Sequence, residues 1–194
     1  MSKNIILASQ SARRKQLLEW AEISFEVITS ATDESFPADM PIIEVPVFIA
    51  KEKALAVKEK LQNAYHGEYV HQTILAADTV VVLDDTIIGK PDDEEHAIKI
   101  LTALSGKKHR VITGVVLLLE DREISFADVT EVEFHPLTQE QIEFYVEKYK
   151  PYDKAGAYAI QEWIGVVGIK SITGDFYNVM GLPVSKVVKI LNGL

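Results

Sequence analysis

Apolar and polar positions alternate along the chain in short blocks, and the spacing within each block predicts strands and helices in turn. Runs rich in β-branched and aromatic residues predict strands over 5–8, 25–28, 73–83, 86–88, 110–119 and 124–134. Apolar residues three and four positions apart predict helices over 12–21, 46–61 and 183–191. The same spacing predicts two more helices, which carry Ala97, Ile100, Leu101 and Leu104 in one case and Ile142, Tyr145, Val146 and Tyr149 in the other.

Short polar links between strands indicate how these strands pair. Asp84-Asp85 joins the strand that ends at Leu83 to the next one, and Glu120 to Arg122 joins the last two predicted strands. Links of this length permit only antiparallel pairing, so a purely parallel sheet is excluded. Together with the intervening helices, the pattern predicts an α/β protein with mixed strand directions.

Several helix ends carry recognisable capping residues. Ser11 stands where an N-cap is expected before the first helix, and Thr138 with Gln141 has the spacing of a capping box. Ser105-Gly106 is expected to end the helix before it. Residues 151–182 are rich in glycine and aromatic residues and match no single period. The final helix is expected to bury its apolar residues, Val184, Val187, Val188 and Leu191.

Composition narrows the class of protein. The 194 residues are 47% hydrophobic and 25% charged, which is typical of a globular domain, and a single domain over 1–194 is expected. The chain has no cysteine, which excludes disulfides, thiolate zinc sites and a cysteine nucleophile. Its five histidines are scattered without an HExxH pattern, which argues against a histidine zinc site.

Charge and hydropathy exclude further classes. The formal net charge of −9 argues against a nucleic-acid binder, which needs a basic face for the phosphates. The longest apolar runs, such as 115–119, are too short to span a bilayer, so no membrane association is expected. The first fifteen residues do not have the pattern of a signal peptide, and a cytoplasmic protein is expected.

The segment Ser9-Gln10-Ser11-Ala12-Arg13-Arg14-Lys15 is the first candidate for chemistry. It follows a predicted strand and opens a helix, where three cations oppose the helix macrodipole. A bound phosphate would resolve this conflict, because backbone N–H groups, the hydroxyls of Ser9 and Ser11 and the guanidinium groups of Arg13 and Arg14 could converge on it. A solvated basic turn is the alternative that this feature alone leaves open.

Acidic residues supply the second candidate. Asp78 interrupts an apolar strand, where a carboxylate must be paired, hydrogen-bonded or bound to a metal. An aspartate that only bonds nearby backbone is the alternative. Thr79 points to the opposite face if the strand is regular. Asp33-Glu34, beyond the second strand, could pair with Asp78 to form a hard-oxygen site for Mg²⁺ or Mn²⁺, although an acidic pair in a loop is commonly solvated.

Two lysines complete the candidates. Lys90 lies in Gly89-Lys90-Pro91 at a strand end, and Lys53 borders the apolar arc of its helix. Lys51 and Lys58 border the other edge, so the helical wheel does not choose among them. Taken singly, each lysine is compatible with a surface charge.

Six blocks that run in order along the chain resemble the signature blocks of Maf proteins. They are Leu7-Ala-Ser-Gln-Ser-Ala-Arg-Arg14, Ala76-Ala-Asp-Thr-Val-Val81, Gly89-Lys-Pro91, Leu104-Ser-Gly106 with Thr113-Gly-Val115, Asp153-Lys-Ala-Gly-Ala-Tyr158 and Asn178-Val-Met-Gly-Leu-Pro183. Each block alone is a weak signal, whereas six in order are highly specific. The resemblance covers residues 5 to about 187, which is nearly the whole chain.

The resemblance implies a Maf/ITPase-like fold, with an elongated mixed sheet, flanking helices and two lobes around a cleft. It implies a house-cleaning nucleoside triphosphate pyrophosphatase that cuts between the α- and β-phosphates, needs a divalent metal and can form a homodimer. The family's proton acceptor falls on Asp78, its second acid on Glu34 and its lysines on Lys53 and Lys90. The expected metal ligands are Glu34 and Asp78, and the expected phosphate-binding residues are Ser9, Ser11, Arg13 and Arg14.

Members that resemble dTTP/UTP pyrophosphatases carry Arg, Thr and Gln at positions that match Arg13, Thr79 and Gln161. A glutamine amide can accept from N3–H of uracil or thymine and donate to O4, although a flipped amide suits cytosine equally well. Glu162 stands where the family usually has glycine. Two other functions stay open, namely a nucleotide-binding regulator of septum formation without turnover, and a pyrophosphatase for non-canonical purine nucleotides.

Overall fold

The structure, a computed structural model, describes residues 4–64, 69, 72–119 and 122–193. The chain forms two compact units. Unit 1 comprises the described residues within 1–78, 113–128 and 181–194, and unit 2 those within 79–112 and 129–180. The presence of two units agrees with the expectation of two lobes.

A seven-stranded mixed sheet runs through the fold in the order β2-β1-β3-β5-β6-β7, with β4 paired to β3. The strands are β1 Ile5–Leu7, β2 Phe25–Val27, β3 Ile74–Leu83, β4 Thr86–Ile88, β5 Lys108–Leu118, β6 Glu123–Phe134 and β7 Ile169–Thr173. β1 pairs in parallel with β2 and with β3, while β3–β4 and β6–β7 are antiparallel. The predicted mixed sheet is therefore confirmed.

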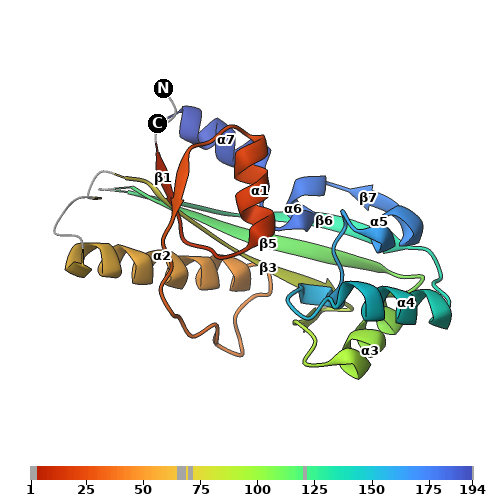
Figure 1. Ribbon diagram of the computed structural model, residues 1–194. Helices are drawn as coiled ribbons and strands as arrows, with labels where there is room; N and C mark the ends of the chain where they lie inside the picture. The colour runs from red at the N-terminus through yellow and green to blue at the C-terminus, as the bar shows by residue number, and fades with distance from the viewer. Residues whose placement is uncertain (1–3, 65–68, 70–71, 120–121, 194) are drawn as a thin grey trace. The chain divides into compact units, whose positions relative to one another are not determined.

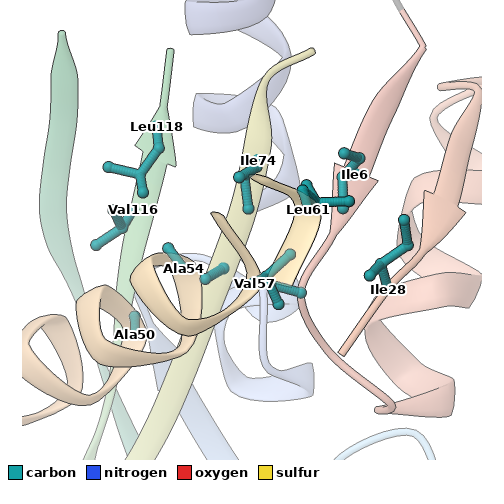
Figure 2. Close-up of a cluster of buried hydrophobic side chains, with 11 residues drawn as sticks. Ile6, Ile28, Ala50, Ala54, Val57, Leu61, Ile74, Val116 and Leu118 are labelled. Atoms are coloured by element: carbon teal, nitrogen blue, oxygen red, sulfur yellow. The ribbon is translucent and has the colours of Figure 1, made fainter. Parts of the chain in front are cut away.

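The core of unit 1 forms where helix α2, Val45–Ala64, packs on the strands. Figure 2 shows Ala50, Ala54, Val57 and Leu61 of α2 beside strand residues of the same cluster. Those strand residues are Ile6 of β1, Ile74 of β3, and Val116 and Leu118 of β5. Because even-numbered residues of these strands face α2, their odd-numbered neighbours face the other way.

The opposite face of these strands is buried as well. Ile5, Leu7, Leu75 and Leu117 are fully buried, which explains why the strands are continuous apolar runs instead of alternating ones. Helices α1, Ala12–Trp20, and α7, Val184–Asn192, lie on the side of the strands away from α2 (Figure 1).

Unit 2 contains most of the short elements. Its helices are α3 Glu94–Leu104, α4 Gln139–Tyr149, the 3₁₀ turn η1 Ala155–Ala157, α5 Trp163–Gly168 and α6 Phe176–Met180. α3 packs against α4 and η1. An aromatic cluster lies within this unit, where the rings of His109 and Tyr158 both contact Phe134, with centroids 5.2 and 5.0 Å away.

The predicted turns and caps agree with the structure where it describes them. Asp84 and Asp85 both have positive φ, of 47° and 59°, as the two central residues of a type I′ hairpin turn require. The capping box of Thr138 and Gln141 is present, and the Ser11 side chain caps α1. In the second predicted turn, residues 120–121 lie outside the described residues.

Segment 151–182, for which the sequence predicted no element, contains η1, α5, β7 and α6. One expectation needs correction. In α7 only Val187 is fully buried among the four apolar residues expected inside, and Val184, Val188 and Leu191 are half-buried. Among the described residues, no helix has both the length and the apolar character to cross a bilayer, the 20-residue α2 included.

Candidate functional site

Two carboxylates and one ammonium group converge in unit 1. Lys53 Nζ on α2 donates to Asp78 Oδ1 on β3 at 2.7 Å and lies 2.7 Å from Glu34 Oε1 in the segment after β2. The side chains of Lys53 and Asp78 are only 17% and 14% exposed, whereas that of Glu34 is 49% exposed. Asp78 and Glu34, which the sequence suggested as a pair, therefore both contact Lys53.

The packing of α2 selects Lys53 over its neighbours. Ala50, Ala54 and Val57 face the strands, and the side chain of Lys53 reaches the point where β3 changes from fully buried to half-buried residues. Lys51 instead forms an exposed ion pair with Glu123, with Nζ and Oε2 3.0 Å apart. The choice that the helical wheel left open is therefore made by tertiary packing.

Asp33 shapes the segment that carries Glu34. Its carboxylate accepts from the backbone N–H of Ser35 at 3.0 Å and from the Ser35 hydroxyl at 2.9 Å. The backbone bond first, and then the hydroxyl bond, hold the pKa of Asp33 below its ordinary value. Asp33 is thus a turn-forming residue, and Glu34 is the member of the acidic pair that reaches Lys53.

The start of α1 forms a second cluster in unit 1. Ser9 Oγ accepts from the backbone N–H of Ser11 at 3.2 Å and from Nη1 of Arg14 at 3.1 Å. Ser11 Oγ in turn accepts from the backbone N–H of Arg14 at 3.4 Å, and Arg14 Nε donates to the carbonyl of Gly181 at 2.8 Å. Arg14 is buried and ties the first block of the resemblance to the last one.

Electrostatics connect the two clusters. Burial lowers the pKa of Arg14, the charge of Asp78 raises it, Arg13 lowers it and Glu34 raises it, in that order of size. The carboxylates therefore offset part of the cost of a buried guanidinium group. The cation excess at the start of α1, which looked unfavourable in the sequence, is therefore partly offset at Arg14 by acids from β3 and the segment after β2.

The two carboxylates are chemically suited to a hard divalent cation. Both approach one cationic centre, Lys53 Nζ, and carboxylate oxygens are the ligands that Mg²⁺ and Mn²⁺ prefer. Across the described part of the chain, no group of three or more His, Asp or Glu residues could hold a metal ion. Glu34 and Asp78 thus fit a Mg²⁺ site of the kind that is completed by water and substrate phosphate.

The remaining site residues belong to unit 2. Thr79 is half-buried on β3, Lys90 is exposed after β4, and Gln161 is exposed in a turn before α5. The sequence pattern did not reveal what supports this turn. Glu162 accepts a hydrogen bond from the hydroxyl of Tyr145, and its φ of −93° is an ordinary value that does not require glycine.

Comparison with known proteins identifies the family of the chain. A family model described as Maf-like protein matches residues 4–194. A dTTP/UTP pyrophosphatase from Cytophaga hutchinsonii is 49% identical, over 95% of this chain and 81% of the relative. Proteins of the same name from Bacteroides thetaiotaomicron and Phocaeicola vulgatus are each 46% identical, over 94% and 98% of this chain and 91% and 95% of the relatives. The match spans both units and every site residue described above, and the chain belongs to the Maf-like protein family.

Proposed function

We propose that the protein is a nucleoside triphosphate pyrophosphatase that hydrolyses dTTP and UTP. The observation that carries this proposal is the convergence of Asp78 and Glu34 on Lys53 beside the buried Arg14. A paired set of acids and cations of this kind can both activate water and neutralise a polyphosphate. Relatives named dTTP/UTP pyrophosphatase, at 46–49% identity over nearly the whole chain, support the substrate class.

In the proposed reaction, water attacks the α-phosphorus and the bond from this phosphorus to the α–β bridging oxygen breaks. The products are a nucleoside monophosphate and pyrophosphate, and the bridging oxygen leaves with the pyrophosphate. Asp78 accepts the proton from the attacking water. Its Oδ1 bonds Lys53, so Oδ2 is the atom that we assign to the proton. Before the cation and the substrate bind, Lys53 holds the carboxylate in one orientation.

The cations have two kinds of role in this proposal. Arg13, Lys53 and Lys90 bind the triphosphate and stabilise the charge that develops on pyrophosphate. Arg14 and Ser9 bond each other, so Arg14 shapes the turn from which Ser9 and Ser11 offer hydroxyl or backbone donors to phosphate. Thr79 and Gln161 contribute to recognition of the pyrimidine nucleoside.

We assign the divalent cation, Mg²⁺ or Mn²⁺, to Glu34 and Asp78. When bound, such a cation neutralises phosphate charge and lowers the pKa of water. Lys53 occupies the space between the two carboxylates, and its flexible side chain allows it to turn toward phosphate when a divalent cation binds.

The test is an assay of product formation with purified protein. dTTP, UTP, CTP, ITP and methylated GTP are incubated with Mg²⁺, with Mn²⁺ and with a chelator, and nucleotides and pyrophosphate are quantified by chromatography. We expect monophosphate and pyrophosphate from dTTP and UTP, and loss of activity with chelator. Tight nucleotide binding without release would favour the regulatory alternative, and preference for ITP or methylated GTP would favour the purine alternative.

We also propose that residues 1–194 act as one domain, since the proposed roles are divided between the two units. Thermal unfolding of the whole chain is then expected to show a single cooperative transition. A homodimer is part of the expectation from the family, and light scattering during size-exclusion chromatography of the assayed sample measures it.

A further inference from the structure

The turn that carries Gln161 is closed by a backbone hydrogen bond. The N–H of Glu162 donates to the carbonyl of Ala159 at 3.1 Å, which places Ile160 and Gln161 at the two central positions of a β-turn. Ile160 is buried, at 4% exposure, while Gln161 is exposed. Ile160 thus anchors the turn in the protein interior, while Gln161 lies at the surface.

A single hydroxyl group connects both ends of this turn. Tyr145 Oη accepts from the backbone N–H of Ala159 at 3.2 Å and donates to the carboxylate of Glu162. Tyr145 is fully buried on α4, and its ring stacks on Tyr149 with centroids 4.9 Å apart. A buried phenol in this position restrains the first and last residues of the turn at once.

Two further contacts support the turn from other directions. Lys154, only 8% exposed, lies 2.7 Å from Asp153 and 3.7 Å from Glu162, so the Glu162 carboxylate has a cation close to it. On the helix side, a Cβ atom at Gly165 would lie 1.7 Å from the carbonyl oxygen of Ile160. The start of α5 therefore packs directly against the backbone of the turn.

We propose that Tyr145 and Glu162 are positioning residues, which hold the Gln161 turn and thereby set the preference for uracil over cytosine. This inference rests on the proposed function. The Gln161 amide in one orientation pairs with N3–H and O4 of uracil, and in the flipped orientation it pairs with cytosine. The turn fixes the position from which the Gln161 side chain reaches the base, so a restrained turn favours one of these pairings, whereas a loosened turn lets the side chain adjust to either base.

The test compares kcat and KM for UTP and CTP in variants that remove the support without changing Gln161. Tyr145→Phe removes one oxygen atom and keeps the ring, and Glu162→Ala removes the acceptor. For each we expect the UTP-to-CTP ratio of kcat/KM to fall about tenfold, mainly through a higher KM for UTP, with kcat within about threefold of wild type. The kcat is expected to persist because the residues proposed for proton transfer and metal binding are unchanged.

Matched variants separate positioning from general damage to the fold. Tyr149→Phe removes a hydroxyl from the same helix, from the ring that stacks on Tyr145, and is expected to keep the wild-type ratio. Glu162→Gln retains an acceptor oxygen for Tyr145 and is expected to keep the ratio within about threefold. The effects of Tyr145→Phe and Glu162→Ala are expected to combine to less than their sum in the double variant, because both changes break the Tyr145–Glu162 hydrogen bond.

Amide hydrogen exchange gives a readout that does not depend on turnover. In Tyr145→Phe the Ala159 amide loses its acceptor, so the peptide that contains it is expected to exchange at least tenfold faster than in wild type or Tyr149→Phe. Exchange that stays at the wild-type rate would overturn the inference.

The outcomes distinguish this inference from the proposed function. Wild-type protein that hydrolyses UTP and CTP equally, or variants that keep the wild-type ratio, would overturn the positioning role and leave the pyrophosphatase proposal standing. A fall in kcat at unchanged KM would also overturn it, because the turn would then act on chemistry. Wild-type protein that releases no pyrophosphate from any pyrimidine triphosphate would overturn the proposed function and the positioning role together.

Discussion

At the scale of the single residue, Lys53 balances the charge of the candidate site. Its ammonium group contacts two carboxylates at 2.7 Å each, in surroundings where Lys53 and Asp78 are largely shielded from water. Two carboxylates that lie close together repel each other unless a cation contacts both of them. Lys53 therefore holds Glu34 and Asp78 in place before substrate arrives.

Replacing Asp78 tests the proton acceptor directly. Asp78→Asn keeps the size and shape of the side chain but removes its basicity, so kcat for UTP is expected to fall about 10²- to 10⁴-fold. Thermal unfolding of the variant serves as the control that the fold persists. A kcat close to that of wild type would show that another group accepts the proton.

Lys53 and Lys51 form a matched pair on one helix, because each truncation removes one positive charge. Lys53→Ala is expected to lower kcat/KM for UTP about 10- to 100-fold, since it removes charge-assisted bonds from a shielded site. Lys51→Ala removes an exposed ion pair with Glu123 and is expected to change kcat/KM less than about twofold. Equal losses of kcat/KM for the two variants in steady-state assays would mean that these lysines contribute only to the overall electrostatic potential and make no specific contact with substrate. Lys90→Ala is expected to have a larger effect than Lys51→Ala.

Gln161→Glu examines base recognition apart from chemistry. A carboxylate can accept from N3–H but cannot donate to O4, and an unmatched polar group costs about 1–3 kcal/mol. The UTP-to-CTP ratio of kcat/KM is expected to fall by about tenfold or more, which corresponds to about 1.4 kcal/mol. An unchanged ratio would remove the pyrimidine assignment and leave the pyrophosphatase assignment intact, because the two depend on different residues.

At the scale of the helix and strand, the helices that the sequence predicts are the long ones. Helices α1, α2, α3 and α4 are predicted because each is at least nine residues long and has a period or a cap that can be read locally. Helices α5 and α6 have six and five residues, too few for a helical period to emerge. The support of the Gln161 turn is not predicted for a different reason, since Tyr145 and Glu162 meet through tertiary packing and no sequence spacing indicates this contact.

The capping box of α4 permits a test at this scale. Thr138 Oγ1 accepts from the N–H of Gln141 at 3.2 Å, so Thr138→Ala is expected to lower the free energy of unfolding by about 1 kcal/mol. Thr102→Ala is the control, because the exposed Thr102 donates only to the carbonyl of Ile98 within α3, where alanine is the better helix former. Urea denaturation followed by circular dichroism measures both, and equal destabilisation would contradict the capping role.

At the scale of the whole molecule, the sequence predicted the class of fold but not its assembly. The hairpins and the parallel βα connections follow from local patterns, whereas the pairing of β6 with β7 joins segments separated by the whole of α4, η1 and α5. In the candidate site, too, some features can be read from the local sequence and others depend on how the chain assembles. Asp78 and Glu34 were recognisable as acids in unusual places, but the contact of Arg14 with Gly181 depends on residues 167 positions apart.

His109 links the charge state of one residue to the stability of the whole molecule. It is 2% exposed on β5, and its Nε2 lies 2.7 Å from the hydroxyl of Tyr158. Burial lowers the pKa of His109 to about 4 and raises the pKa of Tyr158 above its ordinary value, so both groups are neutral at pH 7. His109 therefore acts as a neutral residue of the aromatic cluster in unit 2.

The lowered pKa of His109 predicts a loss of stability in weak acid. The unfolded chain takes up a proton at His109 near pH 6.5 and the folded chain only near pH 4, so protonation favours unfolding between these values. The associated stability is present above pH 6.5 and is expected to decline by about 3 kcal/mol as the pH falls to 4. His109→Gln removes this titration and leaves the carboxylates that also weaken the fold in acid. Denaturant titration measures the unfolding free energy of both proteins from pH 7 to pH 4. The value for His109→Gln minus the value for wild type is expected to rise by about 3 kcal/mol over this range, because only the wild type loses the His109 contribution. A difference that does not change with pH would mean that His109 is protonated equally in the folded and unfolded states, and that its burial in the aromatic cluster does not govern its charge.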